Sequence, residues 1–221
     1  MHNHYTVHCP QGSVLGFSLE GLRCIIDKDV GSVINYLPVQ EYQAKYPSLP
    51  VTKYSDIIQD YQKIEKFKNR VYKTQDRNGR LLLYKELKYP FDVLVQRKEI
   101  ECLSLLSKSM HVITFREVVV SQTPYLIDPG RVSGLMIKGF LTDYTIRGSL
   151  SRVLNEEPEC EWNQRISWSL QIAKGLRNIY DVNLSHIDLN SHNMVIDEHN
   201  SPFIIDLSRT AKTYGWCGPE A

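Results

Sequence analysis

The segment from His186 to Asp206 constrains the fold of this chain more than any other. It opens with a polar loop of the pattern His-x-Asp-Leu-x-x-x-x-Asn, which contains Asp188 and Asn193. Two short apolar runs follow, separated by a polar turn, and the second run ends at Asp206. Such a pattern predicts a β-hairpin. The hairpin would return the chain so that Asp206 faces the polar residues of the loop.

The spacing of these residues resembles the catalytic loop of protein kinases and the Asp-Phe-Gly triplet that follows it. Asn193 lies five positions after Asp188, and Asp206 lies thirteen positions after Asn193. The resemblance implies that Asp188 is a catalytic residue that orients the hydroxyl group of the substrate. It also implies that Asn193 and Asp206 are the metal ligands, which bind Mg²⁺. We expect His186 to bond to the backbone rather than to act as a base.

An upstream lysine and glutamate extend the resemblance. Residues 81–85 predict a strand that ends in Lys85, and Glu99 begins a periodic apolar run fourteen positions later, which predicts a helix. The resemblance implies that Lys85 contacts the α- and β-phosphates of ATP and that Glu99 pairs with Lys85. Lys85 and Glu99 therefore join Asp188 as candidate catalytic residues.

A nucleotide-binding site also follows from the resemblance. Residues 140–150 resemble the hinge between the two kinase lobes, with Thr142 as the gatekeeper. The backbone of residues 143–145 would pair with adenine, and the strand that begins at Val71 would lie against it. The residues that the resemblance assigns to ATP are Val71, Lys85, Asp143, Thr145 and Val195.

Further elements occur in kinase order. Apolar residues recur at helical spacing over residues 162–182, which predicts a long buried helix before the catalytic loop. Ser149 is placed to cap a short helix after the hinge. Residues 218–220, Gly-Pro-Glu, resemble the Ala-Pro-Glu triplet that closes the kinase activation segment, and the chain stops one residue later. We therefore expect part of the apolar face of the 162–182 helix to be exposed or to be covered by a partner.

The predicted fold is α+β, a protein-kinase-like two-lobe architecture. Residues 1–55 form an N-terminal extension of short strands and a linker, the linker spanning residues 38–50. Residues 56–145 form an antiparallel β N-lobe and the hinge, beginning with a short helix at residues 55–61. Residues 146–221 form a truncated, mainly helical C-lobe that ends at the activation segment.

Two departures from the kinase pattern affect the nucleotide site. No glycine occurs from residue 32 to residue 78, and the three positions of the glycine-rich loop hold Ile64, Lys66 and Asn69. Glycine is used there because backbone N–H groups must approach the phosphates closely. In addition, Leu83 replaces a small alanine beneath the adenine, and overpacking of this kind costs about 1–3 kcal/mol.

Three functions fit this pattern. The first is protein kinase activity, the transfer of phosphate from ATP to a Ser or Thr hydroxyl of a protein with Mg²⁺ as cofactor. The second is a catalytically weak or inactive pseudokinase that acts as a binding module, which the two departures favour. The third is a small-molecule phosphotransferase of the aminoglycoside or choline kinase type, which Asn190 and the Ile-Ile-Asp run before Leu207 fit.

Composition narrows the set of partners. The 221 residues include 26 basic and 25 acidic side chains, for a net charge of +1, so we expect neither nucleic acid nor a membrane surface as a partner. A protein substrate or protein partner is expected instead. Five cysteines, an odd number without regular spacing, indicate reduced thiols in a cytoplasmic or nuclear setting.

Overall fold

The computed structural model describes Ile34 and residues 36–63, 70–122 and 134–208, with residues 58–63 described for the backbone alone. The chain divides into two units, residues 1–32 and residues 33–221, and every described residue belongs to the second. The expected strands before residue 34, the substituted glycine loop and the 218–220 triplet lie outside the described residues.

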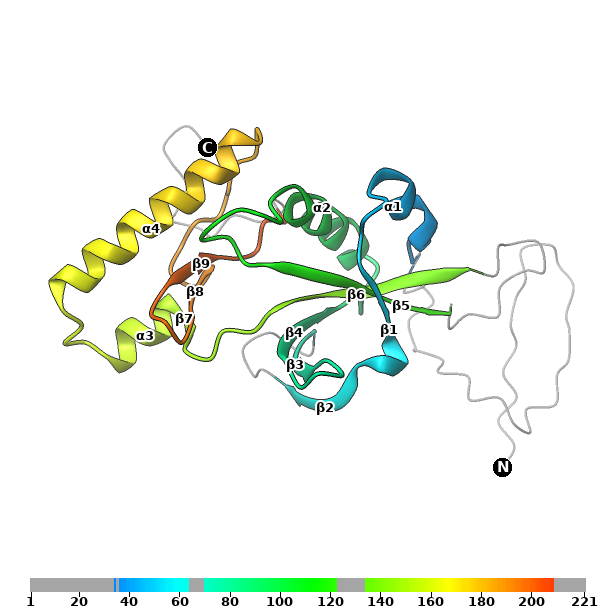
Figure 1. Ribbon diagram of the computed structural model, residues 1–221, viewed down its shortest axis with the longest axis horizontal. Helices are drawn as coiled ribbons and strands as arrows, with labels where there is room; N and C mark the ends of the chain where they lie inside the picture. The colour runs from blue at the N-terminus through cyan, green and yellow to red at the C-terminus, as the bar shows by residue number, and fades with distance from the viewer. Residues whose placement is uncertain (1–33, 35, 64–69, 123–133, 209–221) are drawn as a thin grey trace, which may run out of the picture. The chain divides into compact units, whose positions relative to one another are not determined.

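A six-stranded sheet forms the first part of the fold (Figure 1), with the order β1-β5-β6-β4-β3-β2. All neighbouring strands are antiparallel except β1 and β5, which are parallel. The strands are β1 (Val51–Lys53), β2 (Ile58–Lys63), β3 (Val71–Gln75), β4 (Leu81–Glu86), β5 (Phe115–Gln122) and β6 (Leu135–Asp143).

Local sequence accounts for the β3–β4 hairpin. The Asp76 side chain accepts hydrogen bonds from the backbone N–H groups of Asn78 and Arg80, at 2.8 and 2.9 Å. Gly79 takes a φ of 78°, a conformation that costs a glycine little. The hairpin aligns Val71 directly opposite Lys85, which sets the register of the predicted strands.

Helices α1 (Val39–Lys45) and α2 (Asp92–Leu105) lie on one side of strands β5 and β6 (Figure 1). The prediction of a linker over residues 38–50 is wrong, because this segment contains α1. Pro38 precedes the helix, and Val39 and Tyr42, three positions apart, are both buried in the main core cluster. This tertiary burial stabilises a helix that is too short to form alone.

The short helix predicted for residues 55–61 is also wrong. Only Tyr54–Asp56 forms a single 3₁₀ turn, and the chain then enters β2. Strand β2 pairs with β3 from Ile58 opposite Gln75 to Lys63 opposite Tyr72. Pairing with a neighbouring strand satisfies the backbone here, and residue preferences taken alone do not contain that information.

The second part of the fold contains two helices, α3 (Leu150–Glu156) and α4 (Trp162–Asp181), and a three-stranded sheet. The sheet order is β7 (Gly148–Ser149), β8 (Met194–Ile196) and β9 (Pro202–Ile204), and β8 and β9 form the hairpin that the sequence predicts. Ser149 caps α3 as expected, because its Oγ accepts a hydrogen bond from the backbone N–H of Arg152 at 3.2 Å.

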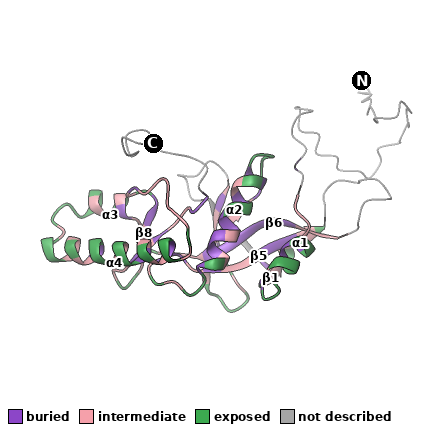
Figure 2. Ribbon diagram, turned by 90° about the horizontal axis from the view of Figure 1, so that it is seen from above, coloured by how far each residue is buried: buried purple, intermediate pink, exposed green. Residues whose placement is uncertain are grey.

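Helix α4 occurs where the sequence predicts it, but it buries a different face. Figure 2 shows many exposed residues along it, and the predicted apolar stripe is largely exposed, with Trp162 72% and Tyr180 65% accessible. The buried face contains Trp168, Gly175 and Ile179. Gly175 allows this close approach, because a Cβ there would lie 2.7 Å from a backbone oxygen of the neighbouring segment. The expectation that part of the apolar face is exposed is confirmed.

Candidate active site

The predicted pair of Lys85 and Glu99 forms a buried ion pair. Strand β4 places Lys85 opposite Phe140 of β6, and α2 presents Glu99. The distance from Lys85 Nζ to Glu99 Oε1 is 2.6 Å, and the two side chains are only 18% and 4% exposed. The expected pairing is therefore confirmed. Glu99 does not begin the helix, however, since α2 starts seven positions earlier, at Asp92.

The charge of Asp206 acts on this pair. Burial favours the neutral form of Lys85, but the negative charges of Glu99 and Asp206 outweigh it, so the pKa of Lys85 lies above its usual value. Burial also raises the pKa of Glu99; Lys85 opposes this shift, and Asp206 adds to it. Three charged groups that the sequence predicts as site residues are thus brought together.

Two side chains of α2, Asp92 and Gln96, make hydrogen bonds that hold the helix in place and that the sequence does not predict. Asp92, at the start of the helix, accepts hydrogen bonds from the N–H groups of Lys88 and Tyr89 at 3.1 and 2.9 Å and pairs with Arg70. Gln96 Nε2 donates to the backbone oxygen of Glu86, the residue after Lys85, at 2.9 Å. Neither contact has a sequence signal, because each depends on how the helix packs.

The polar loop brings Asp188 and Asn193 into contact. Asn193 Nδ2 donates to the backbone oxygen of Asp188 at 2.8 Å and to Asp188 Oδ2 at 3.0 Å. The buried Asn190 also donates to the backbone oxygen of Asp188, at 3.2 Å, and accepts from the N–H of His192 at 2.9 Å. Because the amide nitrogen of Asn193 donates to Asp188, the amide oxygen is the atom of this side chain that could act as a metal ligand.

Backbone contacts tie the end of the hairpin to this loop. The N–H of Ile205 donates to the backbone oxygen of Asn193 at 3.0 Å, and Nε2 of His186 lies 2.8 Å from the oxygen of Ile205. His186 thus contacts the backbone, as expected. The next residue, Asp206, has a φ of 61°, in the left-handed region that is unusual for a residue other than glycine.

The donor set fits a magnesium ion that is shared with a substrate. Among the described residues, no group of three His, Cys, Asp or Glu side chains is placed to hold a metal unaided. Mg²⁺ is commonly held by one or two protein carboxylates together with phosphate oxygens and water. Asn193 and Asp206 would supply two oxygen ligands, and Asp206 has no side-chain hydrogen bond to another described residue.

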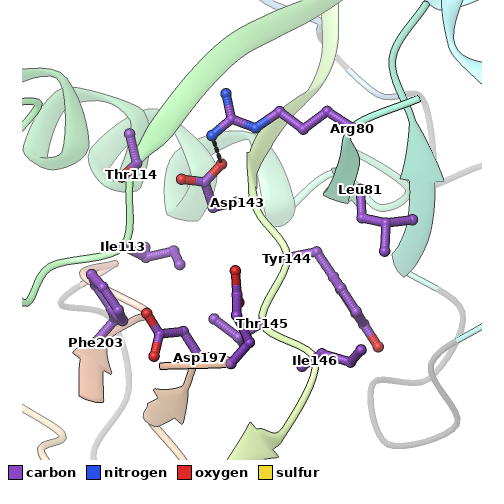
Figure 3. Close-up of a pocket in the computed structure, with 11 residues that line it drawn as sticks. Arg80, Leu81, Ile113, Thr114, Asp143, Tyr144, Thr145, Ile146, Asp197 and Phe203 are labelled. Carbon is purple, nitrogen blue, oxygen red and sulfur yellow. Dashed lines mark ion pairs between the residues drawn. The ribbon is translucent and has the colours of Figure 1, made fainter. Parts of the chain in front are cut away.

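The predicted hinge begins at the end of β6, where Asp143 is held by two arginines. Thr142 is buried opposite Leu83 and Phe115 in the sheet. The Asp143 carboxylate accepts a hydrogen bond from Arg116 Nε at 2.7 Å and pairs with Arg80 Nη2 at 2.9 Å, the second of which is drawn in Figure 3. The sequence predicts neither arginine contact, because Arg116 lies 27 positions before its partner.

A cavity of about 470 Å³ adjoins the hinge (Figure 3). Asp143 and Thr145 line it, together with residues of β9 and of the turn before β9. The other predicted ATP contacts, Val71, Lys85 and Val195, are not part of its lining, so the cavity is not the predicted nucleotide site. The side chain of Asp143 thus faces this cavity and its arginines, which is consistent with a nucleotide contact through the backbone alone.

Comparison with known proteins identifies the family. A family model described as protein tyrosine and serine/threonine kinase matches residues 90–214, which is more than half of the chain. The chain therefore belongs to the protein kinase family, and its α+β fold, with a largely antiparallel sheet before the helical part, agrees with that assignment.

Individual relatives are distant. LIM domain kinase 1 of Drosophila melanogaster is 28% identical over 148 residues, which cover 65% of this chain and 11% of that protein. Dual specificity testis-specific protein kinase 1 of Homo sapiens and of Rattus norvegicus is 26% identical over 138 residues, which cover 62% of this chain and 20% of each relative. The chain thus spans a small part of the length of these relatives.

Proposed function

We propose that this chain supplies the phosphotransfer site of a protein kinase that moves the γ-phosphoryl group of ATP to a Ser or Thr hydroxyl of a protein. The observation that carries the proposal is the buried contact of 2.6 Å between Lys85 and Glu99, together with the nearby charge of Asp206. An isolated buried ion pair contributes little to stability. A pair of this kind beside a third charge is therefore better explained by binding of a polyphosphate.

Each residue has a defined part in this proposal. Asp188 accepts the hydrogen bond of the attacking hydroxyl, and Lys85, oriented by Glu99, contacts the phosphates. The oxygens of Asn193 and Asp206 hold Mg²⁺, which neutralises phosphate charge when it is bound. Because phosphoryl transfer depends mainly on positioning and charge neutralisation, these groups suffice for catalysis.

Adenine would lie between the two parts of the fold. Val71 and Val195 would contact its faces, and the backbone of Asp143 and Thr145 would hydrogen-bond to its edge. Val71 is buried on β3 opposite Lys85, and Val195 lies on β8 opposite Phe203. The pairing of Asp143 with two arginines would hold the hinge in place for this contact.

A pseudokinase that binds partners without catalysis is the second candidate. Leu83 favours it, because this residue lies between Lys73 and Thr142 in the sheet, where its side chain would narrow the adenine site. The protein kinase family assignment favours a protein over an amino-alcohol as the acceptor. One family member among the relatives is named a dual specificity kinase, so tyrosine also belongs among the hydroxyls to be tested.

A reducing, intracellular setting remains our prediction. In the described part of the chain, Cys160 is a free thiol. None of the described helices is long and apolar enough to cross a bilayer.

Nucleotide binding is the first test. The melting temperature of the chain is measured against ATP concentration with and without Mg²⁺, for the wild type and for Asp206→Ala. Ligand at a hundredfold excess over its Kd stabilises a protein by about 2.7 kcal/mol. A shift that needs Mg²⁺ and is lost in Asp206→Ala supports the proposal. The same shift in Asp206→Ala would contradict the role of that carboxylate, and no shift in the folded wild type would favour the pseudokinase.

Phosphoryl transfer is the second test. Peptide libraries with Ser, Thr or Tyr acceptors are incubated with Mg²⁺ and ATP, and the wild type is compared with Asp188→Asn. The variant should retain ATP binding and lose transfer by at least about a hundredfold, because a positioned general base contributes about 10²–10⁴-fold. ATP binding without transfer to any acceptor would leave only the binding module.

A further inference from the structure

The segment before the predicted N-lobe packs onto the sheet and onto α2. Residues 36–53, here called the brace, comprise α1, β1 and the turns beside them. Val39, Tyr42 and Leu49 of the brace are at most 7% exposed and share one buried cluster with Ile100 and Leu103 of α2. The brace is therefore part of the core that supports the Glu99 helix.

Backbone hydrogen bonds attach the brace to two central strands. Strand β1 pairs in parallel with β5, with Val51 opposite Val118, and the N–H of Val118 donates to the oxygen of Pro50 at 2.9 Å. At the other end, the N–H of Ile137 on β6 donates to the oxygen of Leu37 at 2.9 Å. The chain between these two points, which contains α1, is thus held at both ends.

A half-buried lysine strengthens the second of these attachments, the one between β6 and the start of the brace. Lys138 Nζ donates to the hydroxyl of Tyr36 at 2.6 Å and lies 4.1 Å from the centre of the Tyr36 ring. Burial lowers the pKa of Lys138, against the opposing charge of Glu86. The contact with Tyr36 is a polar and aromatic anchor for a side chain that would otherwise be poorly solvated.

Helix α1 contacts α2 directly. Lys45 Nζ lies 3.1 Å from Glu101 Oε1, and Arg97 Nε lies 3.6 Å from the same oxygen. Burial and the charge of Glu101 raise the pKa of Tyr42, so this phenol also lies near the same part of α2. Glu101 is two positions from Glu99, and on a helix these two residues point in very different directions. The brace therefore restrains a flank of α2 that the Lys85 contact leaves open.

We propose that the brace positions α2 so that Glu99 reaches Lys85, and that Tyr42 and Lys45 are positioning residues for the active site. The effect on the active site rests on the proposed function, whereas the restraint on α2 is independent of catalysis. A contact of 2.6 Å is lost if the helix shifts by about one residue rise of 1.5 Å. Displacement of the brace would let α2 move and would leave Lys85 without its partner.

The main test compares Tyr42→Ala with Tyr180→Ala, the same change at a 65% exposed position on α4. Amide hydrogen exchange is followed in α2 and, as an internal reference, in β3 and β4. Tyr42→Ala should speed exchange in α2 by about tenfold or more while the reference strands change much less, because local opening reports the lost packing. Unchanged exchange in α2, or an equal effect of Tyr180→Ala, would overturn the proposal.

A charge exchange on the surface keeps the test decisive if Tyr42→Ala does not fold. Lys45→Glu places two acidic side chains next to each other. Lys45→Glu combined with Glu101→Lys restores a pair of opposite charges. Lys98→Glu, on the exposed side of α2, is the control. Lys45→Glu should speed α2 exchange by about two- to fivefold, and the second change should reverse it. A failure of the second change to reverse the effect would refute the positioning role of Lys45.

Nucleotide affinity separates this proposal from the proposed function. If the wild type binds Mg²⁺ and ATP, Tyr42→Ala should weaken binding by at least the factor by which it speeds α2 exchange, while Tyr180→Ala should not. Loss of helix protection in Tyr42→Ala with unchanged affinity would refute the link to the active site. If the wild type binds no ATP, the proposed function fails, and the exchange data still decide whether the brace restrains α2.

Discussion

Removal of Lys85 should make the stability of this protein depend on pH. The Glu99 side chain is 4% exposed in the wild type, and it should stay buried in Lys85→Met. Its carboxylate then loses the lysine that lies 2.6 Å away. The nearby charge of Asp206, which already acts to raise the pKa of Glu99, then acts unopposed. The folded variant must either hold two uncompensated negative charges together or protonate Glu99.

Protonation of Glu99 sets an upper limit to the loss of stability in Lys85→Met. Breaking a buried pair by removing one partner typically costs about 3–5 kcal/mol. A glutamate with an ordinary pKa of about 4.3 can instead take up a proton, at about 1.36 kcal/mol per pH unit above that value. The loss of stability is therefore limited to about 3.7 kcal/mol at pH 7 and to about 1.6 kcal/mol at pH 5.5.

The sign follows from proton binding. A glutamate with a raised pKa in the folded state binds more protons folded than unfolded, so it destabilises the fold above its ordinary pKa and this penalty is relieved as the pH falls. The loss of stability in Lys85→Met relative to the wild type should therefore shrink by up to about 2 kcal/mol between pH 7 and pH 5.5.

Urea unfolding followed by circular dichroism, at pH 7 and at pH 5.5, measures this difference. Lys98→Met is the control, because Lys98 is exposed on the same helix, and it should stay within about 0.5 kcal/mol of the wild type. Lys85→Met combined with Glu99→Leu removes both charges and should be more stable than Lys85→Met alone. An equal loss at both pH values would refute the reasoning that Glu99 is left as an uncompensated buried acid.

Three further changes test the packing that supports the site. Gly139→Ala should lower the free energy of unfolding by about 3 kcal/mol, because a Cβ there would lie 2.1 Å from the Lys85 backbone oxygen. Gly79→Ala is the control. It has open space but a φ of 78°, and it should lower the free energy of unfolding by only about 1 kcal/mol. Tyr42→Phe should raise the free energy of unfolding by about 1 kcal/mol, since the buried hydroxyl has no hydrogen-bond partner among the residues that the structure describes; a less stable variant would show that the hydroxyl has a partner. Ser149→Ala should lower thermal stability by about 1 kcal/mol through loss of the α3 cap, which an unchanged melting temperature would contradict.

The site contacts that the sequence predicts involve residues close together in the chain, which a loop, a hairpin or a strand followed by a helix can bring into contact. The loop at Asp188 and Asn193 is local, and a hairpin returns Asp206 to it, so spacing alone predicts that these groups meet. Lys85 and Glu99 are only fourteen positions apart, and a strand followed by a helix can bring them together. The roles of these residues in catalysis stay predictions.

The errors arose where long-range packing overrides local preference. Residues 39–45 form a helix because they are buried against other elements, and residues 58–63 form a strand because β3 is beside them. Likewise, α4 buries Trp168 rather than its most apolar stripe, because Trp168 Nε1 reaches the backbone of Asn200 and Gly175 permits a close approach. None of these partners is visible from sequence spacing.

The sequence by itself determined the strand that contains Lys85, the cap of α3 and the hairpin before Asp206, because turns, caps and periodic apolar residues act over a few positions. Only the tertiary structure decided how the Glu99 helix is held, which face of α4 is buried, and that Asp143 is bound by two arginines. These features depend on contacts between residues up to about one hundred positions apart, such as Lys138 and Tyr36, separated by 102. Such contacts form because the folded chain buries apolar surface and pairs its polar groups together, and no local pattern specifies them.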